Sequence, residues 1–412
     1  MSAGKVILSH PTGNANASAV ASALYDNQLL TAFYTCIAWR PESPIAKFVP
    51  GSVRTTLERR ARVQLPPEIV HTRPFRELVR NIFLRAGKKH LIASEGSAFS
   101  IDGIYRDLDR YIARELHKYP EARAVYAYED GALHHFREAR KRGLHRIYDL
   151  PIGYWRANKK ISSEEAELQP AWKGTLNSLA DSEAKGARKD EELELADTVL
   201  VPSTFVKSTL GMYPVKKKVV VNPFGVPVTL SAPREITSRD ASLRVLYVGS
   251  LTQRKGIAYL FDAVERAGKA VTLTVVGRKV GQSDALDSNC EKHRWISSLP
   301  HSEILAEMRR NDVFVFPSLF EGLALVTGEA ISQGMPVITT PNSGGSDILR
   351  DGKDGFIVPI RDPEAITQRL LQLHDDRALL KQMSDSALDR ASELHWQGYK
   401  DRTVAAVREA LG

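Results

Sequence analysis

Short apolar runs recur along the whole chain, and each is followed by a turn residue and then by a helical pattern. In the first half the runs lie at 6–8, 124–128, 146–150, 198–201 and 219–221, and in the second half at 245–248, 273–276, 313–316 and 337–340. Continuous apolar strands of this length are typical of a parallel sheet that helices cover on both faces. Their alternation with helices predicts a doubly wound α/β chain.

A polar stretch without clear periodicity separates the two sets of strands. It follows Asn222-Pro223-Phe224-Gly225-Val226-Pro227, and a new sheet opens at Leu243. A chain of 412 residues also exceeds the size of one ordinary core. We therefore predict two Rossmann-like domains facing each other across a cleft, over 1–226 and 243–390, joined by a linker over 227–242. Loops at the carboxyl ends of the strands are the candidate ligand sites.

Composition narrows the class of protein. Hydrophobic residues make up 43% and charged residues 26%, which are values of a folded chain. The two cysteines, Cys36 and Cys290, lie far apart, so we expect neither a disulfide framework nor a Cys-rich metal site. Neither a signal peptide nor an apolar run of the ~18 residues that span a bilayer is apparent. These features favour a cytoplasmic protein.

The chain has a net charge of +8, and basic residues crowd its first half. Its basic residues there include Arg54, Arg59, Arg60, Arg62, Arg73, Arg76, Arg80, Arg85, Lys88 and Lys89. Within 74–87, apolar residues recur at helical spacing with arginines between them. Such a helix either binds an anionic membrane surface or acceptor, or packs on the core and leaves a basic face in water. No recognition motif accompanies the charge, so nucleic acid is not an expected partner.

The most informative stretch runs from Pro317 to Ala330. A buried strand ends at Pro317-Ser318, a loop of small residues follows, and a helix is predicted to begin between Leu323 and Leu325. Glu321 and Glu329 flank this junction, so they can address opposite ends of one elongated ligand. The backbone N–H groups of Gly322, Leu323 and Ala324 are expected to be free at the helix N-terminus, where they favour anionic or hydroxyl-rich ligands.

Three further segments follow: Gly334-Met335-Pro336-Val337-Ile338, the loop Ser343-Gly344-Gly345-Ser346, and a hairpin-like turn over 351–356. Together with Glu321-x₇-Glu329 they resemble the donor-site signature of retaining family 4 glycosyltransferases of the B-type fold. The resemblance implies that Glu321 and the amides after it hold the transferred sugar's hydroxyls, and that Glu329 accepts hydrogen bonds from the ribose. It also implies that a last helix, over 391–412, crosses back to the N-terminal domain.

The segment from Val248 to Gly256 resembles the diphosphate-binding segment of the same family. Lys255 is the expected cation for the leaving diphosphate, and Arg254 offers a second, bidentate contact. One position departs from the family pattern. Most members of the family carry an arginine directly after the glycine, whereas this chain has Ser250 after Gly249.

Three places in the N-terminal domain are further candidates. Gly13, in the loop after the first strand, resembles the family's first loop, which faces the donor. Asp149 ends a strand where many family members place a histidine next to the donor sugar, and it either lines the cleft or merely ends the strand. Glu129-Asp130-Gly131, after the preceding strand, is a candidate contact of the acceptor.

The resemblance implies transfer of a sugar from a nucleotide-sugar donor to a saccharide or lipid-linked acceptor, with Glu321, Lys255 and Asp149 as candidate catalytic residues. No metal is expected, because cationic side chains can replace a metal's charge. The basic first half suggests cell-envelope polysaccharide or glycolipid assembly at the inner face of a membrane. Three alternatives stay open: a nucleotide-sugar epimerase, a phosphorylase, or a silent module that binds nucleotide sugars without turnover.

Overall fold

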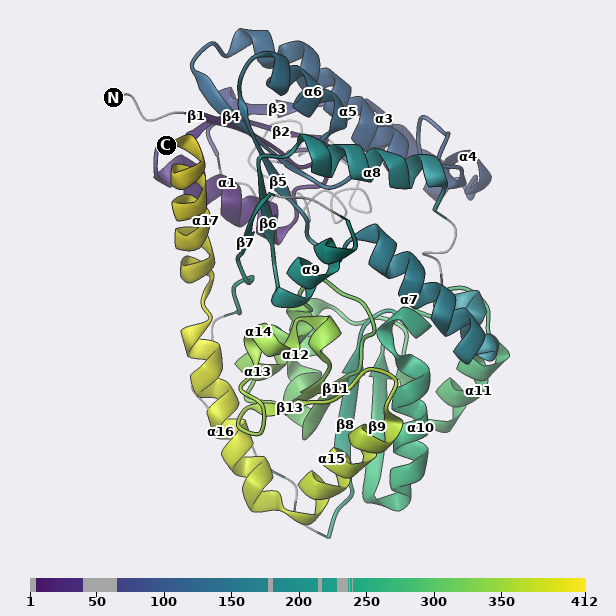
Figure 1. Ribbon diagram of the computed structural model, residues 1–412. Helices are drawn as coiled ribbons and strands as arrows, with labels where there is room; N and C mark the ends of the chain where they lie inside the picture. The colour runs from purple at the N-terminus through teal and green to yellow at the C-terminus, as the bar shows by residue number, and fades with distance from the viewer. Residues whose placement is uncertain are drawn as a thin grey trace.

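The chain folds around two parallel β-sheets (Figure 1). The computed structural model describes residues 5–39, 65–176, 181–213, 217–227, 236, 238 and 240–412. The first sheet has the strand order β3-β2-β1-β4-β5-β6-β7 and the second the order β10-β9-β8-β11-β12-β13. The expected class, two Rossmann-like doubly wound sheets, is confirmed.

The strands of the first sheet are β1 (Lys5–Ser9), β2 (Leu30–Thr35), β3 (Val70–Thr72), β4 (Ala122–Tyr128), β5 (His145–Asp149), β6 (Thr198–Val201) and β7 (Lys218–Val221). Those of the second are β8 (Leu243–Val248), β9 (Val271–Val276), β10 (Arg294–Ile296), β11 (Val313–Phe316), β12 (Val337–Thr339) and β13 (Gly355–Ile357). We refer to the units built on these sheets as the N-terminal and C-terminal domains.

Helices connect these strands and cover both faces of each sheet. In the N-terminal domain they are α1 (Ala15–Asp26), α3 (Phe75–Arg85), α4 (His90–Ala93), α5 (Ile101–Glu115), α6 (Leu133–Lys141), α7 (Trp155–Leu168), α8 (Glu183–Leu195) and α9 (Thr204–Thr209). After them come α10 (Ile257–Ala267), α11 (Asp284–Lys292), α12 (His301–Arg310), α13 (Leu325–Ser332), α14 (Gly345–Ile348), α15 (Pro363–Asp375), α16 (Arg377–Glu393) and α17 (Trp396–Leu411).

The nine apolar runs all form strands, and the first shows why. Along β1 successive side chains alternate between the faces of the sheet. Val6 and Leu8 join the core beneath α1 and α17, whereas Ile7 joins the core beneath α5 and α6. Both faces are therefore apolar, as a buried parallel strand requires.

Four strands of the described chain were not predicted from the sequence pattern. β3, β10 and β13 are three residues long and contain polar or half-exposed residues, and β2 carries two threonines. β13 begins inside the segment 351–356 that was expected to form a hairpin-like turn and extends one residue beyond it. The turn itself is closed by the Gly352 N–H, which donates to the Gly355 carbonyl at 2.8 Å, whereas β13 pairs in parallel with the more distant β12.

The last helix, α17, leaves the C-terminal domain and lies along the N-terminal domain (Figure 1). It packs against α1, and Arg408 donates a hydrogen bond to the side chain of Asn27 at 2.9 Å. Where α17 begins, Val226 donates its backbone N–H to the Leu394 carbonyl at 2.6 Å. The two chain segments that link the domains thus run side by side.

The basic helix α3 does not turn its apolar face to the core with its basic face in water, which was one of the two expected orientations. Its apolar residues Phe75, Leu78 and Ile82 are 70%, 42% and 62% exposed. Arg76 instead donates to the carbonyls of Ala98 and Gly103, at 3.3 and 3.2 Å. An apolar stripe therefore faces outward, and the interpretation of this helix as core-facing with a solvated basic face is wrong. Arg54, Arg59, Arg60 and Arg62 lie outside the described residues.

Gly256, between the 3₁₀ turn η7 (Gln253–Lys255) and α10, gives a test of this packing. Its φ is +69°, and a Cβ there would lie 2.0 Å from the Pro317 carbonyl oxygen. We expect Gly256→Ala to lower stability by roughly 2–4 kcal/mol, because left-handed strain adds to a backbone clash.

The control is Gly352→Ala, since Gly352 has a φ of +74° but nothing within 4 Å of its Cβ position. Thermal and urea unfolding of both variants measures the difference. Equal losses would mean that the approach to Pro317 is not the constraint.

Candidate active site

Two cations and one carboxylate meet at the carboxyl ends of β8 and β11. Lys255 Nζ lies 2.5 Å from Glu321 Oε1, and Arg254 Nη1 lies 3.0 Å from the same oxygen. Arg254 also donates to the Phe320 carbonyl at 2.5 Å. The structure thus brings together three of the predicted site residues, from two segments more than sixty positions apart.

This group carries one positive charge more than it carries negative charge. All three side chains are at most a quarter exposed. Burial lowers the pKa of the Lys255 ammonium, while the nearby Glu321 carboxylate acts to raise it. A second anion bound here would offset both the free-energy cost of burying the cations and the repulsion between them.

The loop that presents Glu321 is held by the loop after β12. Glu321 donates its backbone N–H to the Asn342 carbonyl, and Ala324 donates its own to Ser343, both at 3.0 Å. The expectation of a free amide at Ala324 is therefore wrong, because the glycine-rich loop already accepts it. Gly322 and Leu323, whose backbone N–H groups were also proposed to bind the ligand, directly precede Ala324 in the chain.

The N-terminal domain touches the same loop. Ser203 Oγ donates to the Gly322 carbonyl at 2.6 Å, and the Gly153 N–H donates to the Glu321 carbonyl at 3.3 Å. A Cβ at Gly322 would lie 1.8 Å from the Pro151 carbonyl oxygen, so only glycine permits this approach. The sequence pattern does not reveal Ser203, which caps α9 by accepting from the Val206 N–H.

Glu329 lies in α13 and has a histidine neighbour that was not expected. Its Oε1 is 3.8 Å from Nδ1 of His301, the first residue of α12. The Glu329 side chain is 21% exposed. Burial raises the pKa of its carboxyl, and His301 opposes that rise. Glu329 does not share the cluster of Glu321, Arg254 and Lys255, in keeping with separate roles for the two glutamates.

Gly13 lies in the loop after β1 with φ +57°. Its N–H donates to His10 Nδ1 at 2.9 Å, and Thr12 N–H donates to the same atom at 3.1 Å. The loop therefore curls around the buried His10 ring, which packs edge-on against Tyr128, with 4.6 Å between ring centroids. Sequence reasoning had not singled out this histidine.

Asp149 ends β5 as predicted, but its carboxyl is buried among tyrosines and is only 4% exposed. Tyr126 donates its hydroxyl to Asp149 Oδ2 at 2.6 Å. Burial raises the pKa of Asp149 to about 7. The structure does not join Asp149 to the Glu321 cluster by a hydrogen bond or an ion pair.

The segment after β4 is bonded within its own domain. Lys189 lies 3.2 Å from Glu129 and 3.4 Å from Asp130, and Arg188 lies 2.9 Å from Asp130. The Glu192 carboxylate accepts the Asp130 N–H at 2.9 Å. Asp130 nonetheless lines a hollow of about 360 Å³, together with Tyr105 and Lys185 among others.

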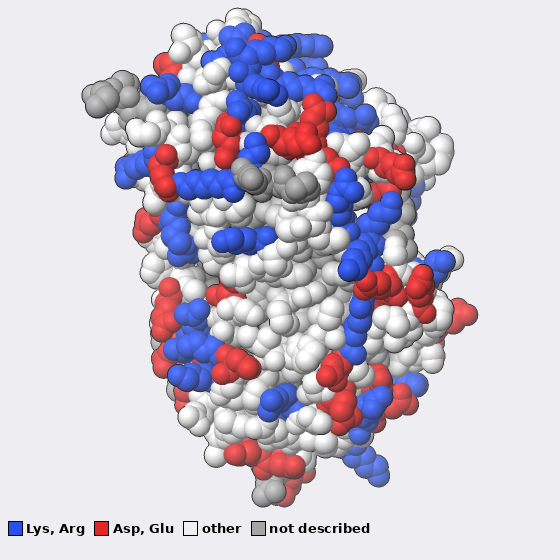
Figure 2. Space-filling model, viewed as in Figure 1, with Lys and Arg blue, Asp and Glu red and all other residues white. Residues whose placement is uncertain are grey.

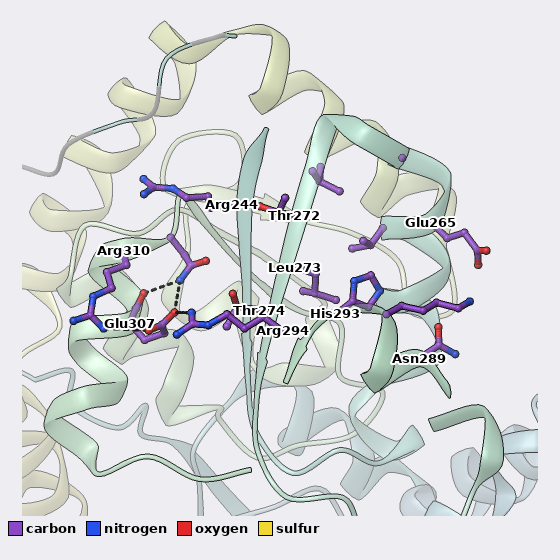
Figure 3. Close-up of a pocket in the computed structure, with 15 residues that line it drawn as sticks. Arg244, Glu265, Thr272, Leu273, Thr274, Asn289, His293, Arg294, Glu307 and Arg310 are labelled. Carbon is purple, nitrogen blue, oxygen red and sulfur yellow. Dashed lines mark hydrogen bonds and ion pairs between the residues drawn. The ribbon is translucent and has the colours of Figure 1, made fainter. Parts of the chain in front are cut away.

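A hollow of about 660 Å³ opens at the other end of the second sheet, where β8, β9 and β10 begin (Figure 3). Arg294 of β10 and Arg310 of α12 are both ion-paired with the buried Glu307 carboxylate, which lies in its wall. Ligands of parallel sheets bind at the carboxyl ends of the strands. This hollow is therefore separate from the candidate donor site.

Comparison with known proteins bears on the domain that carries these residues. Residues 242–376 match the family model described as "Glycosyl transferases group 1". This stretch of the C-terminal domain is thus similar in sequence to the group 1 glycosyltransferases. A glycogen synthase of Mycobacterium tuberculosis is 30% identical over 169 residues, which is 39% of this chain and 41% of that protein. A putative colanic acid biosynthesis glycosyltransferase of Escherichia coli is 27% identical over 48% of this chain and 52% of its own. The alignments thus span about half the length of these relatives, or less.

Solved structures extend the likeness, at the level of the fold, to nearly the whole chain. Sucrose-phosphate synthase from Thermosynechococcus elongatus matches with a TM-score of 0.67 and 16% identity over 98% of both chains. HepE from Anabaena, solved in complex with UDP-glucose, matches with a TM-score of 0.62 and 14% identity over 98% of this chain and 99% of its own. The chain has the B-type glycosyltransferase fold, as its resemblance implied.

The buried Asp149 gives a pH-dependent test. In the unfolded chain this carboxyl loses its proton near pH 4, whereas in the folded protein its pKa is about 7. Between these values the unfolded state binds fewer protons, so stability falls as pH rises. The fall from this group is about 4 kcal/mol over the whole window and about 2.5 kcal/mol between pH 5 and pH 7.5, and we expect Asp149→Asn to remove it. Urea unfolding at pH 5 and pH 7.5 measures it, and identical pH slopes in variant and wild type would contradict the assignment.

Proposed function

We propose that the protein is a glycosyltransferase that binds a nucleotide-sugar donor at the carboxyl ends of β8 and β11. The convergence of Lys255 and Arg254 on Glu321 carries the proposal. These side chains place buried positive charge beside a carboxylate, within the region that matches the glycosyltransferase family. Such an arrangement suits a diphosphate next to a sugar whose hydroxyls a carboxylate can bind.

In the proposed reaction the bond between the anomeric carbon and the diphosphate breaks as the acceptor hydroxyl attacks. Lys255 and Arg254 stabilise the negative charge that grows on the diphosphate, and each such preorganised donor contributes roughly 3–4 kcal/mol. Attack occurs on the face of the departing group, so that configuration is retained. The leaving phosphate takes the acceptor's proton. Asp149 supports the strand end behind the sugar rather than touching it.

The proposal includes no metal, because the two side-chain cations supply the positive charge. Asp107 and Asp109 form an Asp-x-Asp sequence on α5, but both are used within the domain. Asp107 pairs with Arg73 at 2.9 Å, and Asp109 accepts the N–H groups of His134 and His135 at 2.8 Å. These bonds cap α6.

The acceptor, in this proposal, is a saccharide or a lipid-linked saccharide bound by the N-terminal domain. The hollow lined by Tyr105, Asp130 and Lys185 supports it, since it joins an aromatic ring to charged hydrogen-bonding groups. Asp130 has a φ of +72°, and non-glycine residues in that conformation cluster at functional sites. Cell-envelope polysaccharide or glycolipid assembly is the setting that fits such an acceptor.

Nucleotide binding is the first test. A nucleoside diphosphate at a hundred times its dissociation constant adds about 2.7 kcal/mol to stability, which thermal unfolding detects. We expect one of UDP, ADP and GDP to shift the wild type, and the shift to shrink at least by half in Glu329→Ala. The control is Glu303→Ala, an exposed glutamate on α12.

Transfer assays then separate the alternatives. A binding module that turns nothing over would show the melting shift without release of the nucleoside diphosphate. An epimerase would convert the donor without an acceptor. If none of the three nucleotides shifts the wild type at millimolar concentration, the transferase proposal fails.

We further propose that α3 docks the protein on the inner, cytoplasmic face of an anionic membrane. Its outward stripe of Phe75, Leu78 and Ile82 is bordered by the exposed Lys88 and Lys89. Apolar groups that enter a headgroup layer, with cations beside them, are the pattern of an interfacial helix. A second copy of this chain is a less favourable partner for this surface, because it would bring a basic helix against another basic helix. Figure 2 shows lysine and arginine crowding the same end of the molecule. No helix of the described residues is long and apolar enough to cross a bilayer.

Vesicle sedimentation tests this surface. We expect the wild type to bind phosphatidylglycerol vesicles, and Phe75→Ser/Ile82→Ser to lose at least tenfold in affinity, because two exposed apolar anchors are removed. Met212→Ser is the control, since Met212 is 45% exposed outside α3. Equal binding of both variants, or equal binding to vesicles of neutral lipid, would rule out this mode of docking.

A further inference from the structure

A segment of the first half of the chain packs on the C-terminal domain. It consists of α7 and the 3₁₀ turn η4 (Pro170–Thr175), and we call residues 155–176 the strap. The Trp172 ring stacks on Phe261 of α10, with 6.0 Å between centroids, and Ser283 Oγ donates to the Ala171 carbonyl at 2.8 Å. Figure 1 shows α7 beside α10 and α11.

The backbones of strap and domain touch directly. Gly281 has a φ of +72°, and a Cβ there would lie 1.8 Å from the Gly174 carbonyl oxygen. A Cβ at Gly174 would in turn lie 2.1 Å from the Gln282 carbonyl oxygen. Only glycine at both positions permits this approach, which places the strap's backbone directly against the domain.

Glu165 is the buried charge of the strap, with no exposed surface. All the side chains that bind its carboxylate belong to the C-terminal domain. Oε2 accepts from Gln253 Nε2 at 2.9 Å, Oε1 accepts from Arg361 Nε at 2.5 Å, and the Tyr259 hydroxyl lies 3.1 Å from Oε2. Both oxygens therefore act as acceptors, and the site requires a carboxylate.

Gln253 connects this carboxylate to the donor site. It is fully buried and directly precedes Arg254 and Lys255 in η7. Its backbone N–H donates to Thr175 Oγ1 of the strap at 2.9 Å, and its Oε1 accepts the Ala258 N–H at 3.1 Å. The strap thus fixes Gln253 at both its main chain and its side chain.

We propose that Glu165 and Thr175 are positioning residues for the two donor-site cations. They hold Gln253, and through it η7, so that Arg254 and Lys255 meet the diphosphate in a fixed geometry. Without the hydrogen bonds of Glu165 and Thr175 to Gln253, repulsion between Arg254 and Lys255 would move their side chains away from each other. The proposal rests on the proposed function, since it assigns these cations to the donor's diphosphate.

The test compares binding of a nucleoside diphosphate and its monophosphate in three variants. Glu165→Gln sets an amide –NH₂ against Arg361 or Gln253, and Thr175→Val removes the acceptor of the Gln253 N–H while keeping the side chain's shape. Tyr259→Phe is the matched control, because it removes a hydrogen bond to Glu165 but leaves both bonds to Gln253.

Calorimetry with UDP, ADP and GDP first identifies the nucleotide that binds the wild type, and its monophosphate is then compared. We expect the ratio of the monophosphate to the diphosphate dissociation constant to fall five- to tenfold in Glu165→Gln and in Thr175→Val. The ratio should stay within twofold of wild type in Tyr259→Phe, whatever each variant loses in melting temperature.

Two outcomes overturn the proposal. One is an unchanged ratio of dissociation constants in Thr175→Val. This variant decides the question in case Glu165→Gln does not fold. The other is an equal fall in Tyr259→Phe, which would mean that any loss of strap stability has the same effect. Absence of binding in the wild type would instead overturn the proposed function, so the two failures are distinguishable.

Discussion

Two partly buried cations share a single oxygen of Glu321, and much of the surrounding structure serves to hold them there. Arg254 and Lys255 repel each other, and burial penalises both charges. One carboxylate neutralises only one of them. The remaining positive charge is what makes this end of the sheet attractive to an anion.

The groups that impose this constraint come from distant parts of the sequence. The Glu321 loop is held by the loop after β12 and by Ser203 of the N-terminal domain. The turn that carries the cations is held by Gln253, whose partners Glu165 and Thr175 lie in the strap. The candidate donor site is therefore assembled from both halves of the chain, although its sequence signature lies in only one.

Sequence pattern predicted most of the fold because buried parallel strands are apolar on both faces. The three-residue strands β3, β10 and β13 carry too few apolar positions to stand out. In the site, the resemblance to a known family pointed to Arg254, Lys255 and Glu321, which the structure brings together. It could not identify Glu165, a polar residue in an ordinary helix, because its role depends on which domain that helix covers. Likewise, helical spacing showed that α3 has two faces but not which of them its neighbours leave exposed.

Ser250 explains why the strap matters in this chain. The position directly after Gly249 carries no charge, and the Ser250 carbonyl accepts the Tyr247 hydroxyl at 3.0 Å. The cations of the cluster then come from η7 alone, as two consecutive residues of one short turn. A rotation of that turn would move both charges together, whereas cations on separate segments would move independently. A site whose positive charge depends on one turn needs that turn fixed from outside, and Glu165 and Thr175 are the strap residues that reach it.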